Sequence, residues 1–354
     1  MKGAVERGDT ETGLSIMGSL WWFWGAYPSE GRRLVTQALA LPGSRRAPAR
    51  AKSLIAAAGL AFLRGDYDDA TERSEAALAM SRRLGDERLM ATATIWLASI
   101  ARDRGSYRRA LALHGRGLAL SRKSGDLWLT ARSLYSLTLL SQVRGAHADS
   151  TGPLQEALRL FEQIGDKEGI AEATGLLAQA LMQQGKWDTA AEIFEQCLEF
   201  AGESEDLESA AWCSAGLGAV AVHNDDGERA EAMYRTALSN FFKLGMKLGI
   251  ARSLEGIAMG ASLRGNQEKA AVLFSSGERL RETMATPLPH NDRLLHDAHV
   301  ERVRRQLGPD RFAGLWTRGH LLSLEDAATV GLDGAWKSHL LEVTDRQLVR
   351  LKST

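Results

Sequence analysis

The chain has 354 residues, and its 44 Lys and Arg residues balance its 44 Asp and Glu residues, so the formal net charge is zero. A chain without net charge has no long-range field that would draw it to nucleic acid or to an anionic membrane. Two cysteines are too few for a disulfide framework, and no segment has the form of a signal peptide or a membrane span. We therefore expect a cytoplasmic protein that binds neither nucleic acid nor membranes directly.

A turn residue recurs every 40 residues along most of the chain, and a fixed period of this length is typical of stacked helical units. A second turn follows about halfway through most units, as in Gly85-Asp86, Gly125-Asp126 and Gly165-Asp166. Since Gly accepts the left-handed conformation that ends a helix and Asp caps the next helix, each unit is predicted to be a helical hairpin. The recurring turn residues are Gly25, Gly65, Gly105, Gly145, Gly185, Asp225 and Gly265.

Small residues recur at fixed positions of both predicted helices, and they indicate where neighbouring helices approach closely. Bulky residues at other fixed positions would fill the space between the helices. Together these positions predict the core of a stack. The first helices share Ala51, Ala91, Ala131, Ala171, Ala211 and Ala251, whereas the second helices share Ala70, Ala110, Ser150, Ala190, Ala230 and Ala270, and then Leu154, Phe194, Tyr234 and Phe274.

The pattern within each unit resembles the tetratricopeptide repeat. Its marks are the Gly-x-aromatic turns ending at Tyr67, Tyr107 and Trp187, the Ala five residues after each of these glycines, and a later Ala-Leu pair. The resemblance covers about residues 10 to 284, in units longer than the usual repeat of about 34 residues. It implies an all-α, right-handed superhelical solenoid of about seven helix-turn-helix repeats.

Both ends of the array resemble a narrower group. Residues 11–41 are similar to the first sensor repeat of bacterial signal-transduction ATPases, including MalT-like and LuxR-type transcriptional regulators, and residues 287–327 are similar to the segment that follows their repeats. In those proteins an ATPase module precedes the repeats, but this sequence has no G-x-x-x-x-G-K-[ST] loop. It is therefore either the sensor region of such a regulator or a free-standing protein derived from one.

Three parts are expected along the chain. Residues 1–284 form the repeat array, residues 285–332 form a C-terminal helical cap, and residues 333–354 form a charged tail. Terminal repeats need a cover for their outer face, and Ser323 and Asp326 are placed as a capping pair for a short last helix. Apolar positions predicted to pack in the cap are Leu294, Leu295, Val300, Val303, Leu307, Phe312 and Leu315.

No pattern in the sequence supports catalysis, a cofactor or a metal. The stretch from Gly216 to Ala221 matches a dinucleotide-binding fingerprint, but it lies within a predicted helix and follows no strand. Asp292, His296 and His299 could share one helical face and bind a metal. We interpret them instead as surface residues of an amphipathic helix, because no fourth ligand can be named. The protein is predicted not to be an enzyme.

The first helices of a tetratricopeptide array line its inner, concave surface, and the resemblance implies the same here. Residues on this face vary in type and combine aromatic side chains with charges, as expected of a groove that binds a protein, a peptide or a small effector. The alternative is an ordinary half-buried surface. Glu255 is expected on the same face. We name the following residues the inner row: Arg102, Arg132, Tyr135, Glu172, Gln179, Trp212, His223 and Arg252.

The sequence thus predicts a non-enzymatic, protein-, peptide- or effector-binding sensor domain of a signalling or transcriptional regulator. The alternative is a free-standing structural adaptor that scaffolds two protein partners. The Lys and Asn residues with which similar arrays clamp a chaperone C-terminus are missing, since Ile95 and Ser99 stand at two of the corresponding places. The sequence carries no prediction of the oligomeric state.

Overall fold

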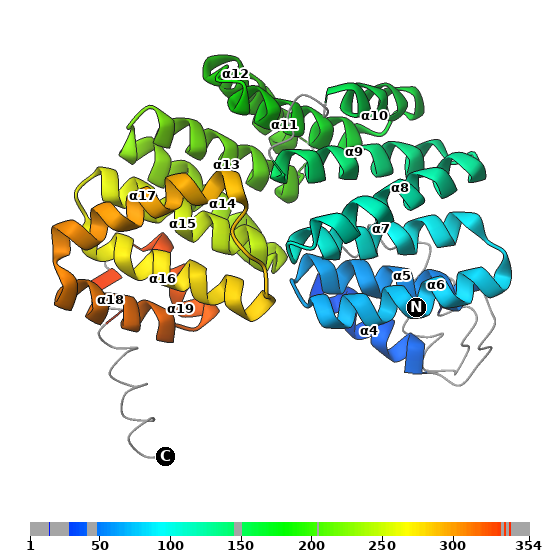
Figure 1. Ribbon diagram of the computed structural model, residues 1–354, viewed down its shortest axis with the longest axis horizontal. Helices are drawn as coiled ribbons and strands as arrows, with labels where there is room; N and C mark the ends of the chain where they lie inside the picture. Colours follow the sequence, from blue (N-terminus) through cyan, green and yellow to red (C-terminus); the bar gives the residue numbers. More distant parts are fainter. Residues whose placement is uncertain are drawn as a thin grey trace. The chain divides into compact units, whose positions relative to one another are not determined.

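The computed structural model describes Leu14, residues 28–40, 48–144, 151–203 and 205–333, and residues 336, 337 and 340. Within these ranges the chain consists of α-helices joined by short turns, without a strand (Figure 1). The predicted all-α class is confirmed. The chain forms two compact units, Met1–Ala173 and Thr174–Thr354, a division inside one helix that the repeat pattern does not predict.

From α4 to α10 each helix of the first unit packs on the next one, in the order in which they occur along the chain. The unit also takes in the beginning of α11, the helix in which the division falls. Its helices are α4 (Pro28–Ala40), α5 (Pro48–Leu63), α6 (Tyr67–Leu84), α7 (Glu87–Asp103), α8 (Tyr107–Ser124), α9 (Leu127–Val143), α10 (Thr151–Ile164) and α11 (Lys167–Gln183).

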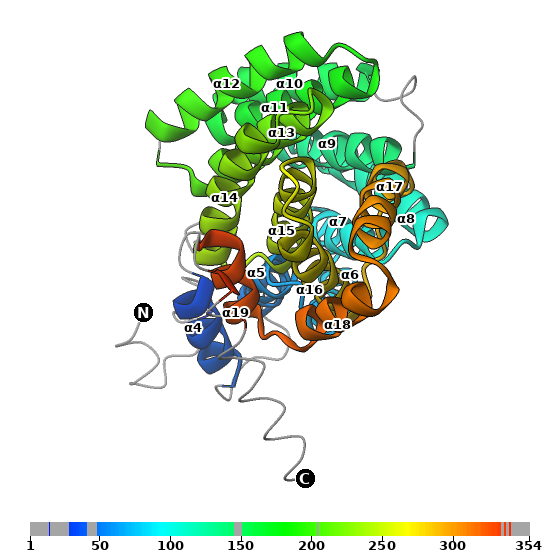
Figure 2. The ribbon, with the colours of Figure 1, turned by 90° about the vertical axis from the view of Figure 1, so that its left-hand side faces the viewer.

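The second unit continues the same pattern and adds three helices after the last repeat. Figure 2 shows α15 between α14 and α17. The helices that follow α11 are α12 (Trp187–Glu203), α13 (Leu207–His223), α14 (Gly227–Leu244), α15 (Lys247–Leu263), α16 (Gln267–Met284), α17 (His290–Leu307), α18 (Pro309–Leu321) and α19 (Leu324–Leu332).

The helix ends confirm the predicted turn chemistry. Gly85 and Gly125 end their helices with φ of 67° and 70°, and Asp225, which replaces the recurring Gly, takes φ of 55°. The Asp86 carboxylate accepts a hydrogen bond of 3.0 Å from the backbone N–H of Leu89 and so caps the helix that follows it. Asp126 and Asp206 cap α9 and α13 in the same way. Gly25 and Gly145 lie outside the described residues.

The predicted small residues lie in the core. Every Ala of the first-helix column is buried, and so is every Ala of the second-helix column; Ser150 lies outside the described residues. The bulky residues Leu154, Phe194, Tyr234 and Phe274 are buried as well. His114 stands in this bulky column at 0 % exposure, and burial, with a smaller repulsion from Arg102, lowers its pKa to about 3. His114 is therefore a neutral core residue.

The segment after the repeats packs on α16, α14 and α15. The hydroxyls of Ser275 and Ser276 on α16 donate hydrogen bonds to the backbone carbonyls of Trp316 (2.7 Å) and Gly319 (3.0 Å) on α18. A Cβ at Gly319 would lie 2.3 Å from the carbonyl oxygen of Val272. A side chain at this position would thus prevent α18 from approaching α16 so closely.

Two details of the predicted cap have different outcomes. The backbone N–H of Asp326 donates to the Ser323 hydroxyl at 3.1 Å, which confirms the N-cap of α19. The prediction that Leu294 and Leu295 are packed is wrong, since they are 73 % and 48 % exposed. Val303 of α17 is fully buried, and Leu294 and Leu295 lie on the face of the helix turned to solvent.

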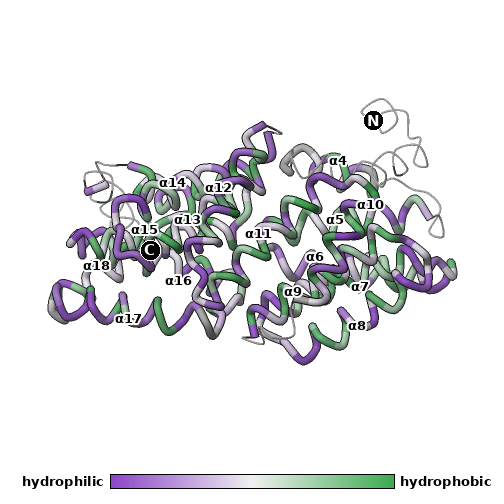
Figure 3. The backbone as a smooth tube through the Cα atoms, turned by 90° about the horizontal axis from the view of Figure 1, so that it is seen from above, coloured by the Kyte–Doolittle hydropathy of each residue, from purple (hydrophilic) through white to green (hydrophobic). Residues whose placement is uncertain are grey.

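No helix in the described part of the chain is long and apolar enough to cross a membrane. Hydrophilic and hydrophobic residues are mixed along each helix, as Figure 3 shows. This mixing is expected of helices that bury one face and expose the other.

The buried Ala column predicts a large difference between two substitutions on α8. Ala110→Arg places a charged side chain in a position with 0 % exposure and should lower the free energy of unfolding by about 3 kcal/mol or more. Ala112→Arg, two residues away at an exposed position, should change it by about 0.5 kcal/mol or less. Equal thermal midpoints for the two variants would contradict the assigned register.

The contact between α16 and α18 predicts opposite effects for two glycines of α18. Gly319→Ala should destabilise the second unit by about 1 to 3 kcal/mol, because the added methyl group forces the helices apart. Gly314→Ala meets no atom within 4 Å and should stabilise α18 by up to about 1 kcal/mol through its higher helix propensity. Chemical denaturation of both variants tests this contact, and destabilisation by both would argue against it.

Candidate functional site

The inner row has one cluster in the first unit, centred on Arg132 of α9. Its guanidinium group forms an ion pair with the carboxylate of Glu172 on α11. The same group lies 5.7 Å from the ring centroid of Trp128 and 5.3 Å from that of Tyr135. Burial lowers the pKa of Arg132, but Glu172, together with Tyr135 and Glu168, outweighs this effect and raises the pKa above its usual value, so the group stays charged beside the two rings.

Arg102 of α7 lies at 12 % side-chain exposure and is paired with its neighbour. Its Nε donates a hydrogen bond of 2.7 Å to Asp103, whose carboxylate also accepts a bond of 3.1 Å from the Tyr67 hydroxyl. Burial opposes the charge on Arg102, yet the attraction of Asp103 raises its pKa above the usual value. These contacts fix the guanidinium group within the first unit.

In the second unit the row contains Trp212 and Arg252. The Trp212 ring packs edge-on against Phe241, with centroids 4.7 Å apart, and the Arg252 guanidinium lies 5.9 Å from the centre of the Trp212 ring. Arg252 also lies 3.8 Å from the carboxylate of Asp292 on α17. The row therefore extends from α13 through α15 onto α17, a continuation that the repeat period does not predict because α17 lies beyond the repeats.

The two remaining row residues lie apart from this group. The exposed His223 at the end of α13 stacks on Trp187, with ring centroids 3.8 Å apart and ring planes 10° apart. Gln179 on α11 is half-buried. His223 stacks on the aromatic residue of the preceding turn, so this pair lies at the edge of the row.

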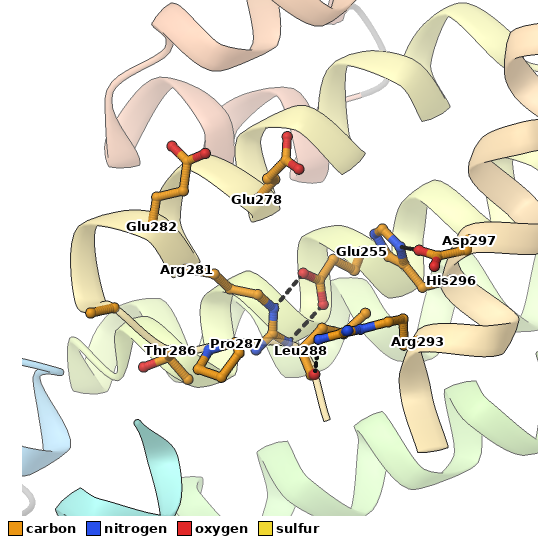
Figure 4. Close-up of a pocket in the computed structure, with 11 residues that line it drawn as sticks. Glu255, Glu278, Arg281, Glu282, Thr286, Pro287, Leu288, Arg293, His296 and Asp297 are labelled. Carbon is orange, nitrogen blue, oxygen red and sulfur yellow. Dashed lines mark hydrogen bonds and ion pairs between the residues drawn. The ribbon is translucent and has the colours of Figure 1, made fainter. Parts of the chain in front are cut away.

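A cavity of about 480 Å³ opens between α15, α16 and α17 in the second unit (Figure 4). One wall is formed by the segment that joins α16 to α17, including Pro287 and Leu288. We name it the α15–α17 cavity. Its charged and polar residues are Glu255, Glu278, Arg281, Glu282, Thr286, Arg293, His296 and Asp297.

The α15–α17 cavity contains a buried ion pair. The Arg281 guanidinium donates hydrogen bonds of 2.6 and 2.8 Å to the two carboxylate oxygens of Glu255, and their side chains are 8 % and 5 % exposed. Glu255 was expected on the open face of the array, but Arg281 covers it. A two-point pair of this kind fixes α15 against α16 and keeps the shape of the cavity.

The other charged groups leave the α15–α17 cavity acidic. Its four carboxylates face two guanidinium groups, so two negative charges remain in excess if His296 is neutral. Glu278 accepts a hydrogen bond of 3.2 Å from the Trp316 indole, and Arg293 donates one of 3.2 Å to the carbonyl of Leu288. A cavity with this balance favours a cationic or hydrogen-bond-donating group.

The residues weighed as metal ligands do not form a metal centre. Asp292 lies near Arg252, and His296 contacts Asp297 through its Nδ1 at 3.1 Å. The interpretation of His299 as a surface residue is wrong, since it is buried. No group of three or more residues suited to holding a metal occurs in the described ranges. What the arrangement offers is recognition through aromatic, cationic and carboxylate groups.

Comparison with known families finds one repeat. The family model described as tetratricopeptide repeat matches residues 173–208, which include the end of α11, α12 and the start of α13. No match was found among curated proteins.

Comparison with solved structures finds the same fold along most of the chain. One similar structure is a Rap protein complexed with Competence and Sporulation Factor, with a TM-score of 0.60 and 11 % identity over 91 % of this chain and 99 % of that chain. Another is aspartyl phosphate phosphatase F from Bacillus subtilis, with a TM-score of 0.57 and 15 % identity over 80 % of this chain and 74 % of that chain. The chain therefore has a helical repeat fold of the tetratricopeptide type.

The buried Glu255–Arg281 pair predicts a strongly non-additive result. Glu255→Gln leaves the Arg281 charge uncompensated and should cost about 3 to 5 kcal/mol, whereas the double variant Glu255→Met/Arg281→Met should lie within about 1 kcal/mol of the parent. Glu282→Gln, at a carboxylate that is 51 % exposed, is the control and should change stability little. Additive losses in urea unfolding would show that the two side chains are not coupled.

Proposed function

We propose that this protein is a non-enzymatic binding protein that holds a segment of a partner protein, or a peptide, against the inner row. The contact begins at Trp212 and Arg252 and continues into the α15–α17 cavity. The observation that supports this most directly is the cavity itself, which opens beside α15, the helix that carries Arg252. A small effector that occupies the same cavity is the other form of this proposal.

The chemistry of the residues supports recognition of a polypeptide. Tryptophan and arginine concentrate binding energy at interfaces, and Trp212 is half-buried while the Arg252 side chain is 42 % exposed. The acidic excess of the cavity favours a segment with a Lys or Arg side chain. That a Rap protein of the same fold has been solved in complex with Competence and Sporulation Factor agrees with a binding role.

The first-unit residues of the row are proposed as a second contact area. Arg132, Tyr135 and Glu172 form one rigid group, which suits a contact that needs no rearrangement on binding. Arg102 belongs to the same first-unit area, whereas Gln179 and His223 belong to the second unit and complete the proposed set there. Because repeats contact mainly their neighbours, a ligand that touches several of them can bias the geometry of the array.

We propose further that the protein is the sensor domain of a signalling or transcriptional regulator, and that binding of the partner is the signal it detects. In a complete regulator the change in the array would pass to an ATPase module, as the resemblance at both ends of the repeats suggests. A structural adaptor would instead join two proteins through other surfaces, and the experiment below separates the two roles.

A displayed library of random peptides, selected against the full chain, supplies a defined probe. Trp212→Ala and Arg252→Ala should each weaken a selected peptide by about 2 kcal/mol, or roughly 30-fold, because they remove the anchors while the helical signal stays unchanged. Glu199→Ala and Lys243→Ala, at exposed positions on α12 and α14, are the matched controls and should have no effect. Selected peptides should be basic and should bind more weakly as salt is raised.

The opposite pattern has a clear meaning. Peptides that bind the Trp212→Ala/Arg252→Ala variant undiminished, yet fail with the α12 and α14 variants, place recognition on the second helices. That result would reject the inner row and favour the adaptor.

A further inference from the structure

The two cysteines of the chain face each other across one helical hairpin. Cys197 lies on α12 and Cys213 on α13. The turn between these helices has Glu205 at φ of 55°, eight residues after Cys197 and eight residues before Cys213. In two helices that run in opposite directions from one turn, residues at equal distances from that turn lie opposite each other.

The same two positions hold small residues in the other hairpins of this kind. This choice marks a place where consecutive helices approach closely, because Ala, Gly and Ser have the smallest side chains. All of these residues are buried. The equivalent pairs are Ala77 with Ala93, Gly117 with Ser133, Ala157 with Ala173, and Ala237 with Ser253.

The thiols of Cys197 and Cys213 are in direct interaction. The two residues are 5 % and 3 % exposed and belong to one buried cluster with Phe194 and Leu217. A hydrogen bond links their thiols. Because the Cys213 S–H donates to Cys197, the pKa of Cys197 is lowered, while this bond and burial raise the pKa of Cys213. Cys197 is therefore assigned as the nucleophile of the pair in the reaction that follows.

We propose that Cys197 and Cys213 form a reversible disulfide that links α12 to α13 when the protein meets hydrogen peroxide. The Cys197 thiolate attacks one peroxide oxygen and breaks the O–O bond, which yields a sulfenic acid and, after protonation, one water molecule. Cys213 then attacks the sulfenic sulfur, forms the S–S bond and releases a second water molecule. The two thiols lose two electrons in total, and these reduce the peroxide.

The disulfide changes the part of the second unit that carries the inner row. Trp212 directly precedes Cys213, so the bond fixes the helix that presents this side chain. It also closes a short loop, which restricts the unfolded chain and stabilises the hairpin. Since both thiols are buried, the peroxide reaches them through local opening of α12 from α13.

The test treats the full chain with hydrogen peroxide across a urea series that stays below the unfolding transition, and then blocks free thiols with iodoacetamide. Digestion without reductant should release one linked pair of peptides that contain Cys197 and Cys213, with a mass two hydrogen atoms below the sum of the reduced peptides. The yield should rise with urea as the hairpin opens. The oxidised protein should have a thermal midpoint about 5 °C or more higher, and dithiothreitol should reverse both changes.

The controls are Cys197→Ala and Cys213→Ala, which place in this hairpin a residue that other hairpins have at the equivalent positions. Both variants should fold with the same helical signal and should show no peroxide-dependent rise in the thermal midpoint. Alkylation of both cysteines at every urea concentration, or a disulfide between two chains in place of the one within the chain, would overturn the proposal. A rise in the midpoint of either Ala variant would do the same.

Discussion

The structure depends on close contact between consecutive helices, which small side chains at fixed positions make possible. Where the Ala columns place a methyl group at the contact, the helices approach until backbone and Cβ atoms pack, and bulky residues such as Phe194 and Phe274 fill the remaining space. Beyond the repeats the same constraint acts through Gly319, which lets α18 pack on α16. Because the small residues at the helix contacts are kept from repeat to repeat, the residues of the inner row can vary in type without disturbing the packing.

The sequence predicted well whatever is local or periodic. Gly85, Asp86 and Asp225 identify turns through their own conformational preferences, and the Ala columns identify the core through their recurrence. Predictions of burial failed where the burial of a side chain depends on neighbours from distant helices. Glu255 belongs by position to the open face, but Arg281, 26 residues later, covers it. Leu294 and Leu295 looked like core residues because an apolar type alone does not tell which face of α17 is buried.

For the candidate site, too, the sequence predicted periodic positions but not contacts between distant helices. Periodicity placed Arg132, Tyr135, Trp212 and Arg252 on one face, but it could not show that Arg132 is held by Glu172 between two rings. Nor could it predict the α15–α17 cavity, since α17 and the segment before it lie outside the repeat pattern. Asp292 illustrates the limit: the sequence indicated a surface residue of its helix, but it could not show that this carboxylate lies beside Arg252. Arg252 on the last repeat thus has its partner on α17, a helix that lies beyond the repeats.

The proposed binding surface is formed by α13, α15 and α17. Photo-crosslinking tests it directly: a display-selected peptide carrying a benzophenone is bound to the full chain, irradiated, and its attachment points are located by mass spectrometry. The peptide should attach to residues around Trp212, Arg252 and the segment 285–297. Attachment confined to α12, α14 or the turns between repeats would contradict it.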